Sequence, residues 1–139
     1  MARFEVSGIA DLCNDLASLA ELPDSVTDDI LNAEADVIVD AQRRTMERML
    51  KGRYSTGDTA RSIKKGKIKK GKDGKCISVS PQGTNRRGER NAAVAFINEY
   101  GKRGQPARPA IRTANAEAES AAIEAGEKVY HAYLDSKKL

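Results

Sequence analysis

The sequence is poor in the residues that most catalytic and metal sites use. Among its 139 residues are one histidine, His131, and two cysteines, Cys13 and Cys76. A nucleophile–histidine pair or a histidine-rich metal cage would depend on that single imidazole near the C-terminus. Two cysteines without a secretory signal do not indicate a disulfide framework, and we expect both to be buried free thiols. We predict no cofactor, no metal site and no enzymatic activity.

Aromatic residues and long apolar runs are also scarce. Tryptophan is absent and aromatics make up 4% of the residues. Alanine, valine, isoleucine and leucine must then fill the core, which favours close-packed helices against a small sheet. No run of about 18 apolar residues is present to cross a membrane, and acidic residues interrupt the N-terminal segment before it forms a signal core. We expect one domain, residues 1–139, made in a cytoplasm and without a membrane partner.

Charge is plentiful and unevenly distributed. Residues 1–60 carry 6 Lys and Arg against 12 Asp and Glu, residues 61–90 carry 11 against 2, and residues 91–139 carry 7 against 6. An acidic first part followed by a basic middle predicts a dipolar molecule that pairs head to tail with copies of itself or meets a charged partner. An ordinary solvated hairpin would show the same charge run.

Hydrophobic spacing in the first half predicts a strand and two helices. Residues 3–6 fit a short strand, and Ser7 fits the cap of a helix that Pro23 ends. Ser25 and Asp28 form an approximate capping box for a second helix, predicted to run to about Met49. The expected inner faces are Ile9, Leu12, Cys13, Leu16 and Leu19 in the first helix, and Val26, Ile30, Ala33, Val37 and Ala41 in the second.

The second half predicts a β-hairpin and two further helices. Residues 60–81 fit two strands around a turn at Gly71–Gly74, and the polar loop 82–90 should order only on a partner. Asn91 fits the cap of a short helix over residues 91–100, although alternation of its apolar residues keeps a strand open. A long helix follows Pro109, with Gly126 at a close crossing and an expected buried stripe of Ile111, Ala114, Ala118, Ala121, Ala125 and Val129. The expected fold is α+β, a small antiparallel sheet with a basic hairpin packed against two N-terminal helices and a long C-terminal helix.

The stretch FINEYGKRGQPARPAIRT, residues 96–113, is typical of a contact surface. Apolar residues at helical spacing lead to Gly101, which can supply a left-handed helix stop, and Pro106 and Pro109 stiffen the connection to the next helix. The stretch holds no nucleophile with its base, no metal cage and no phosphate cradle. Such a sequence positions one rigid surface against another.

A phosphate-binding loop is excluded despite a partial match. The segment GKIKKGKD, residues 66–73, fits G-x-x-x-x-G-K-[ST] except at its last position, where Asp73 replaces the hydroxyl that would bind magnesium. The loop should also open a helix, whereas this segment leads into a strand.

Nucleic-acid binding is the principal alternative to protein contact. The basic segment 61–90 carries seven lysines on the predicted hairpin and three arginines on the next loop, enough to neutralise a row of phosphates. It carries no stacking aromatics and no recognition helix. Any DNA contact through this hairpin should therefore be nonspecific and sensitive to salt.

Several segments taken together resemble the small tail-component family of tailed bacteriophages and prophages. The similarity runs in order through FEVSGIADLCNDLASL, STGDTARSI and AFINEYGKRGQPARPAIRTA. The chain departs from the family where Thr59 replaces a frequent large aliphatic residue and where Ala110 replaces a frequent Phe. Packing at those two positions should therefore differ.

The resemblance implies a tail-completion or head–tail joining protein with a compact α+β fold similar to tail terminators. It implies a ring, commonly of six copies, between the tail tube and the head connector, assembled in the bacterial cytoplasm. It implies no catalytic residue, and contact with DNA would be incidental. We expect the partner-facing positions to be Arg86, Arg87, Arg90, Lys102, Arg103 and Arg108.

Overall fold

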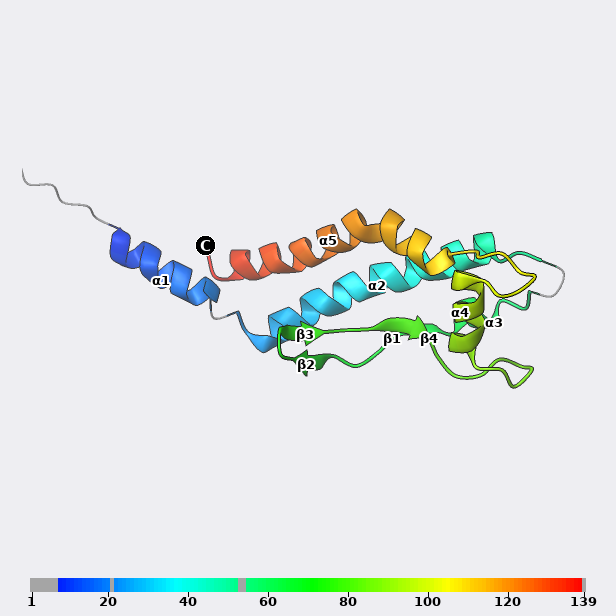
Figure 1. Cartoon of the computed structure of the whole chain (residues 1–139). Coiled ribbons are helices and arrows are strands. Elements are labelled where there is room, and N and C mark those ends of the chain that lie inside the picture. Colours follow the sequence, from blue (N-terminus) through cyan, green and yellow to red (C-terminus); the bar gives the residue numbers. More distant parts are fainter. Residues whose placement is uncertain (1–7, 21, 53–54, 139) are drawn as a thin grey trace, which may run out of the picture.

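The computed structural model describes residues 8–20, 22–52 and 55–138, and these form an α+β fold, as predicted (Figure 1). The predicted strand at residues 3–6 and the Ser7 cap lie outside the described residues. The helices are α1 (Ile9–Ala20), α2 (Asp24–Met49), α3 (Asp58–Arg61), α4 (Asn91–Tyr100) and α5 (Ala110–Ser136). The strands are β1 (Ile63–Lys65), β2 (Lys69–Gly71), β3 (Gly74–Cys76) and β4 (Val79–Pro81).

The body is an antiparallel pair of long helices, α2 and α5, with the hairpin lying along α2 (Figure 1). The α5 face toward α2 consists of small residues spaced four apart: Ala110, Ala114, Ala118, Ala122 and Gly126. Small side chains let two helices approach closely. The prediction of an alanine stripe was correct for Ala114 and Ala118. It was wrong for Ala121, which is exposed, because the buried row follows a strict four-residue spacing.

Gly126 marks a close crossing, as predicted. A Cβ atom added there would lie 2.9 Å from Cδ of Glu34 on α2. Between this crossing and the other end of the helix pair, Gln42 is 3% exposed and donates from Nε2 to Oδ1 of Asn115 at 2.8 Å. Its own Oε1 has no hydrogen-bond partner among the described residues. The two long helices are therefore joined by small apolar residues and by two polar contacts, this buried bridge and an exposed ion pair between Arg48 and Glu117 at 3.5 Å.

The hairpin contains a register shift that the sequence analysis did not predict. Ile63 pairs with Pro81 and Lys65 with Val79, whereas Lys69 pairs with Cys76 around the predicted Gly71–Gly74 turn. Lys67 and Ile68 on the first strand therefore face only Ile77 on the second, which is a β-bulge. Residues 63 and 68 are an odd number apart, so a regular strand would place their side chains on opposite faces. The bulge lets Ile68 be partly buried while Ile63 is fully buried.

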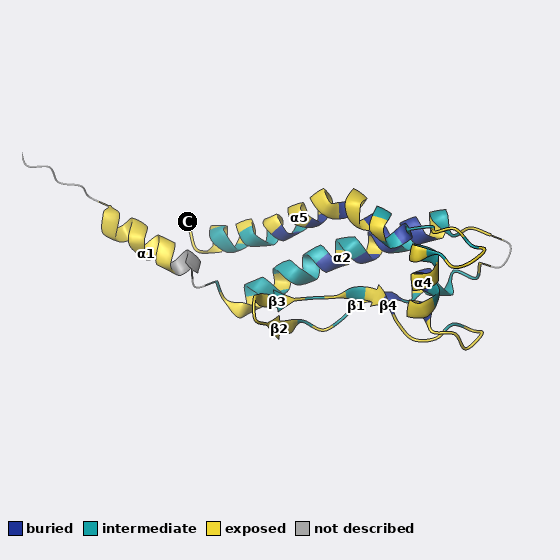
Figure 2. Ribbon diagram, in the orientation of Figure 1, coloured by how far each residue is buried: buried dark blue, intermediate teal, exposed yellow. Residues whose placement is uncertain are grey.

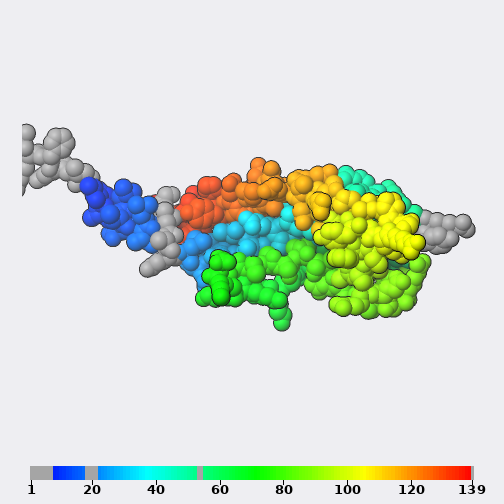
Figure 3. Space-filling model, viewed as in Figure 1, coloured from blue at the N-terminus to red at the C-terminus, as the bar shows by residue number. Residues whose placement is uncertain are grey.

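Helix α1 forms as predicted, but its apolar face is not buried. Ile9, Leu12 and Leu16 are 55%, 57% and 55% exposed. Figure 2 shows α1 as an exposed helix that projects from the body, and Figure 3 shows its blue atoms standing apart from the other elements. The prediction that both cysteines are buried was also wrong, because Cys13 and Cys76 are exposed free thiols. The core is instead centred on Val39, Met46, Ala60, Ile63, Ala95 and Ala110.

Two predicted helix caps are wrong, and one short helix was missed. Helix α2 begins at Asp24 after Pro23, so Ser25 lies inside its first turn. Helix α4 begins at Asn91, which is buried and donates from Nδ2 to the carbonyl of Gln82 at 2.9 Å. The helical prediction for residues 91–100 was correct. The missed helix, α3, lies between α2 and β1.

Candidate interaction surface

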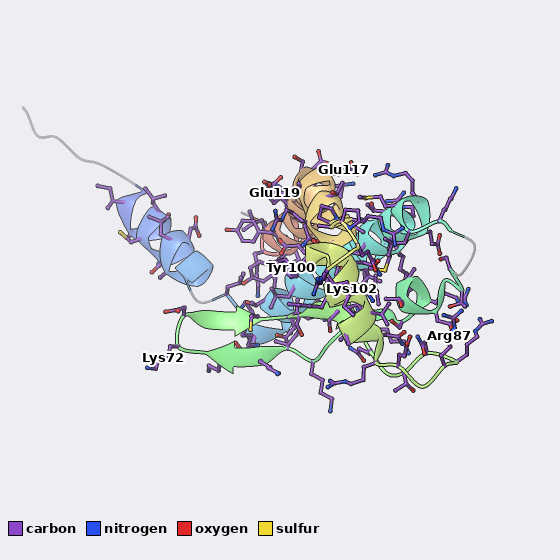
Figure 4. The ribbon with its side chains drawn as sticks, turned by 45° about the vertical axis from the view of Figure 1, so that its right-hand side comes forward. Lys72, Arg87, Tyr100, Lys102, Glu117 and Glu119 are labelled. Atoms are coloured by element: carbon purple, nitrogen blue, oxygen red, sulfur yellow. The ribbon has the colours of Figure 1, made fainter. Side chains whose placement is uncertain are left out.

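The six predicted partner-facing residues lie on two loops at one end of the molecule. Figure 1 shows residues 82–90 and 101–109 together at the end opposite α1, and Figure 4 shows Arg87 at this end and Lys72 at the distant hairpin tip. We call residues 82–90 and 101–109 the loop end. A cavity of about 400 Å³ lies between the two loops and the end of α2, with Arg87 and Arg108 in its lining and Met46, Leu50 and Val94 as apolar residues.

The loop 82–90 is ordered by its own hydrogen bonds, which corrects the expectation that it orders only on a partner. The side-chain Oδ1 of Asn85 accepts the backbone N–H groups of Arg87 and Glu89 at 2.9 and 3.0 Å. The Asn85 backbone N–H donates to the Glu89 carbonyl at 2.8 Å, and Thr84 and Arg90 form an antiparallel bridge. Asparagine closes turns in this way because its short side chain reaches backbone amides two residues on. Arg87 is therefore presented at a fixed turn.

Asp58 fastens this loop to α3. Arg86 donates Nε to Oδ2 and Nη2 to Oδ1 of Asp58, both at 2.9 Å, and Arg61 donates to Oδ1 at 2.7 Å. The side chain of Asp58 is only 16% exposed, although the two arginines are open to water. The hydrogen bonds from Arg86, followed by those from Arg61, hold the pKa of Asp58 well below its usual range. Two-point bonding of this kind fixes the orientation of a guanidinium group.

The loop 101–109 is held by glycine geometry and by Asn98. Gly101 ends α4 at φ 78° and ψ 175°, so its φ is positive as predicted but its ψ lies outside the left-handed helical region. A Cβ at Gly101 would lie 2.9 Å from the backbone N of Ala107 and from the carbonyl O of Gln105. Arg108 donates its backbone N–H to the Asn98 carbonyl at 2.6 Å and Nη2 to Oδ1 of Asn98 at 3.1 Å.

Glu99 joins the end of α4 to the beginning of α5. Its carboxylate accepts the backbone N–H of Ile111 at 2.9 Å and that of Arg112 at 2.8 Å. Pro109, which precedes α5, makes no side-chain cap. Free amides at a helix start need acceptors, and a negative group is favoured there by the helix dipole. Glu99 supplies this cap from a neighbouring helix, a role that the sequence analysis did not identify.

The structure divides the six predicted residues by their contacts. Arg86 and Arg108 hold the loops through Asp58 and Asn98. Lys102 and Gln105 exchange backbone hydrogen bonds at 3.0 and 2.9 Å, which places Arg103 and Gly104 at the tip of a tight turn. The side chains that remain available to a partner are exposed: Arg87, Arg90, Lys102 and Arg103.

The predicted charge asymmetry is partly neutralised inside the chain. Lys65 on the hairpin pairs with Asp36 of α2 at 2.9 Å, and Lys75 pairs with Asp28 at 2.7 Å and Asp24 at 3.4 Å. The hydrogen bond to Asp28 raises the pKa of Lys75. Because the basic hairpin lies on the acidic helix, these charges are satisfied without a second copy. The other hairpin lysines are exposed: Lys64, Lys67, Lys69, Lys70 and Lys72.

An apolar patch on α4 belongs to the same end of the molecule. Phe96 and Tyr100 are 63% and 60% exposed, their ring centroids are 4.7 Å apart, and Ile97 is 36% exposed. Their helical spacing had predicted the helix, but the face that α4 buries instead includes Asn91 and Ala95. A single sequence cannot tell which of two faces is covered when one carries the large residues and the other the small ones.

Side chains that could together bind a metal ion are not gathered in the described part of the chain. No group of three or more His, Cys, Asp or Glu side chains in that part has metal-site geometry. His131 is exposed on α5, 6.1 Å from the ring of Tyr130. The GKIKKGKD segment forms β2 and the hairpin turn. Among the described residues, no helix combines the length and the apolar character needed to span a membrane.

Comparison of the chain with protein-family models, curated proteins and solved structures finds no match.

Proposed function

We propose that the chain is a structural assembly protein of a tailed bacteriophage or prophage, acting at the head–tail junction. In this role it self-associates and docks to tail-tube and head-connector proteins. The observation that carries the proposal is the bracing of the loop end by bonds within the chain. Asp58 holds Arg86, and Asn98 holds Arg108. A surface ordered before binding loses less conformational entropy when a rigid partner docks.

The sequence resemblance also favours the loop end as the contact surface. The segments that carry the resemblance include Glu99–Gly101 and Ala107–Pro109. Glu99 caps α5, Gly101 permits the close approach of the Gln105–Ala107 backbone, and Arg108 bonds to Asn98. These residues therefore shape the loop end, and the exposed positions beside them are suited to contact another protein.

Charge reversal at the exposed positions tests the proposal. Arg87→Glu and Arg103→Glu alter charge without removing the Asp58 or Asn98 contacts. We expect both variants to fold and to lose most of their ability to complete infectious particles when isolated heads and tails are mixed with purified protein. The measurement is the titre of joined particles, with negative-stain microscopy of the junction.

Lys72→Glu is the matched control, because Lys72 is exposed at the hairpin tip far from Arg87 (Figure 4). It makes the same change in net charge and should leave joining intact. If Arg87→Glu and Arg103→Glu join heads to tails as well as Lys72→Glu does, the loop end is not the docking surface. Failure of wild-type protein to join particles that lack this component would contradict the proposed role itself.

Nonspecific nucleic-acid binding is the second candidate, favoured by the five exposed lysines of the hairpin. If they contact phosphates, duplex affinity should fall steeply between 50 and 200 mM salt, on the order of tenfold or more. Replacing Lys69, Lys70 and Lys72 together by Gln should then weaken binding and reduce the salt slope. Filter binding at several salt concentrations measures both. Salt-insensitive or unchanged binding would exclude the hairpin as a phosphate contact.

A further inference from the structure

Helix α1 carries an apolar face that its own chain leaves uncovered. Ile9, Leu12 and Leu16 are each more than half exposed, and Cys13 lies on the same face. Three aliphatic side chains on one side of a 12-residue helix are typical of a helix that packs against a partner. The exposed fractions of these side chains show that the face is open to another surface, and Figure 3 shows the blue atoms of the helix at one end of the molecule.

A groove between α4 and α5 offers a surface of matching character. It has a volume of about 400 Å³, and its lining includes Pro81, Ala92, Phe96, Tyr100, Ile111 and Arg112. Phe96 and Tyr100 are exposed, whereas Ile111 is partly buried and packs against the core. Amphipathic helices commonly bind in such grooves through residues spaced three and four apart. The spacing of Ile9, Leu12 and Leu16 fits this mode.

Most of the apolar face of α1 cannot reach the groove of its own chain. Asn115, at the groove, bonds to Gln42. At the helical rise per residue, Gln42 lies about 27 Å along α2 from Asp24. Three residues link Ala20 to Asp24 and span about 13 Å when extended. With that link fully stretched, Leu12 and Leu16 would lie no more than about 25 and 19 Å from Asp24, and only Ile9 would reach as far as about 30 Å. Because the three side chains cannot enter this groove together, an α1 helix that fills it comes from another molecule.

The charges around the two surfaces are complementary. The described part of α1 contains Asp11 and Asp15 and no basic residue. The groove has Arg112 in its lining, and the exposed Lys102 follows Tyr100 closely, as Figure 4 shows. Glu99, the acidic residue at the groove, already bonds with its carboxylate to two backbone amides. An acidic amphipathic helix in this groove would lie beside the basic side chains of Arg112 and Lys102.

We propose that α1 of one copy docks in the α4–α5 groove of a second copy. Each molecule then provides one helix and one groove, so the contact is head to tail and repeats into a closed ring or an open filament. The proposal gives a structural basis for the self-association in the proposed function. It does not depend on a phage role, because the contact forms between copies of this chain alone.

Cross-linking between different copies tests which surfaces meet. One protein keeps Cys13 and carries Cys76→Ser, and the other carries Cys13→Ser, Cys76→Ser and Ala92→Cys. A short bismaleimide should give a covalent dimer in the mixture and little in either protein alone. A chain with both Cys13 and Ala92→Cys should give a ladder of larger products. Equal dimer yield from the Cys13 protein alone would show α1–α1 pairing and overturn the proposal, as would a mixture that stays uncross-linked.

Matched substitutions test how much each surface contributes to the affinity of self-association. The measurement is light scattering after size-exclusion chromatography. Leu12→Glu places a charge on the apolar face and should weaken self-association at least about tenfold, because burial of one leucine is lost. Ala10→Glu adds the same charge at an exposed position to the side of that face and should have little effect. Phe96→Ser should act like Leu12→Glu, whereas Ile123→Ser, at an exposed apolar position two turns beyond Asn115, should not.

Circular dichroism and urea midpoints confirm that each variant folds, which is expected because all four positions are exposed. Association that is unchanged by both Leu12→Glu and Phe96→Ser would overturn the proposal, and so would a wild-type protein that is monomeric at tens of micromolar. The phage role is judged separately. Cross-linked chains that fail to join heads to tails would contradict the proposed function but not the helix-in-groove contact.

Discussion

The carboxylate of Glu99 accepts the backbone N–H of Arg112 at 2.8 Å, so the last turn of α4 caps the first turn of α5. The same carboxylate bonds to Ile111. One side chain therefore connects the helix that carries the apolar patch to the helix that forms the body, beside the packing of Ala95 and Ala110 in the core. Glu99 also lines the groove between the two helices.

Replacing Glu99 should destabilise the protein without unfolding it. Glu99→Ala removes the acceptor for two amides and should lower the free energy of unfolding by about 1–2 kcal/mol, the usual value of a helix cap. Glu99→Gln keeps an acceptor and should cost less. Urea denaturation measures both, with Glu119→Ala, at an exposed position on α5, as the control that should change stability by less than about 0.5 kcal/mol. Equal costs for Glu99→Ala and Glu119→Ala would contradict the capping role.

Gly101 should tolerate no side chain, in contrast to Gly104. Gly101 combines φ 78° and ψ 175° with backbone atoms 2.9 Å from an added Cβ. That backbone region is essentially restricted to glycine, and Gly101→Ala should cost about 3 kcal/mol. Gly104 also has a positive φ, of 80°, but a Cβ added there would meet nothing within 4 Å, so Gly104→Ala should cost about 1 kcal/mol. Thermal unfolding of the two variants distinguishes steric conflict from strain alone.

The Asp58–Arg86 contact should make stability depend on acid pH. Arg86 holds the pKa of Asp58 below its unfolded value of about 3.9. A lowered folded-state pKa gives stability that is fully present above the unfolded pKa and is lost as the pH falls toward the folded pKa. Asp58→Asn should therefore be less stable than wild type at pH 6, and the difference should narrow as the pH falls from 5 to 2.

Urea midpoints at several pH values measure this difference. Asp29→Asn is the control for the loss of one carboxylate, because Asp29 is exposed on α2. A gap between wild type and Asp58→Asn that stays constant down to pH 2 would mean that the ion pair contributes nothing through ionisation.

The four-residue spacing on α5 predicts different effects of the same substitution at Ala114 and at Ala121. Ala114 is 0% exposed against α2, and Ala114→Leu should overfill the contact and cost about 1–3 kcal/mol. Ala121 is exposed, and Ala121→Leu should be neutral within about 0.5 kcal/mol. Chemical denaturation checks both variants. A larger loss for Ala121→Leu would restore the stripe expected from the sequence.

Hydrophobic periodicity was sufficient to predict the long helices, the hairpin turn and the α+β class. These elements depend on local patterns such as the alternation around Ile77 and Val79 and the long helical stretch after Pro109. Which face each helix buries was harder to predict, because α4 and α5 pack through alanines while Phe96, Tyr100 and Ile123 are exposed. Small residues give a weak hydrophobic pattern even where they form the closest contacts.

The basic residues of the loop end could be identified from the sequence. The hydrogen bonds that order its two loops could not. Asn85 bonds to Glu89, Asn98 to Arg108 and Asp58 to Arg86, pairs that are 4, 10 and 28 residues apart in sequence. Such pairs leave no periodic pattern. The pairing of Lys75 with Asp28 was not predicted for the same reason, because the two residues are 47 apart in sequence. A charge run can be read from sequence, whereas its neutralisation by a neighbouring element requires the fold.

Because of the extra residue at Lys67–Ile68, the pairing register of the two strands differs by one residue between the two ends of the hairpin. Lys75, which reaches Asp28, lies on the strand that pairs without an insertion, so its direction is independent of the length of the other strand. Lys69 pairs with Cys76 and Lys70 with Lys75, whether one or two residues lie opposite Ile77. The turn of the hairpin and its attachment to the long helix through Lys75 can therefore stay unchanged while the strand near Ile63 gains or loses a residue.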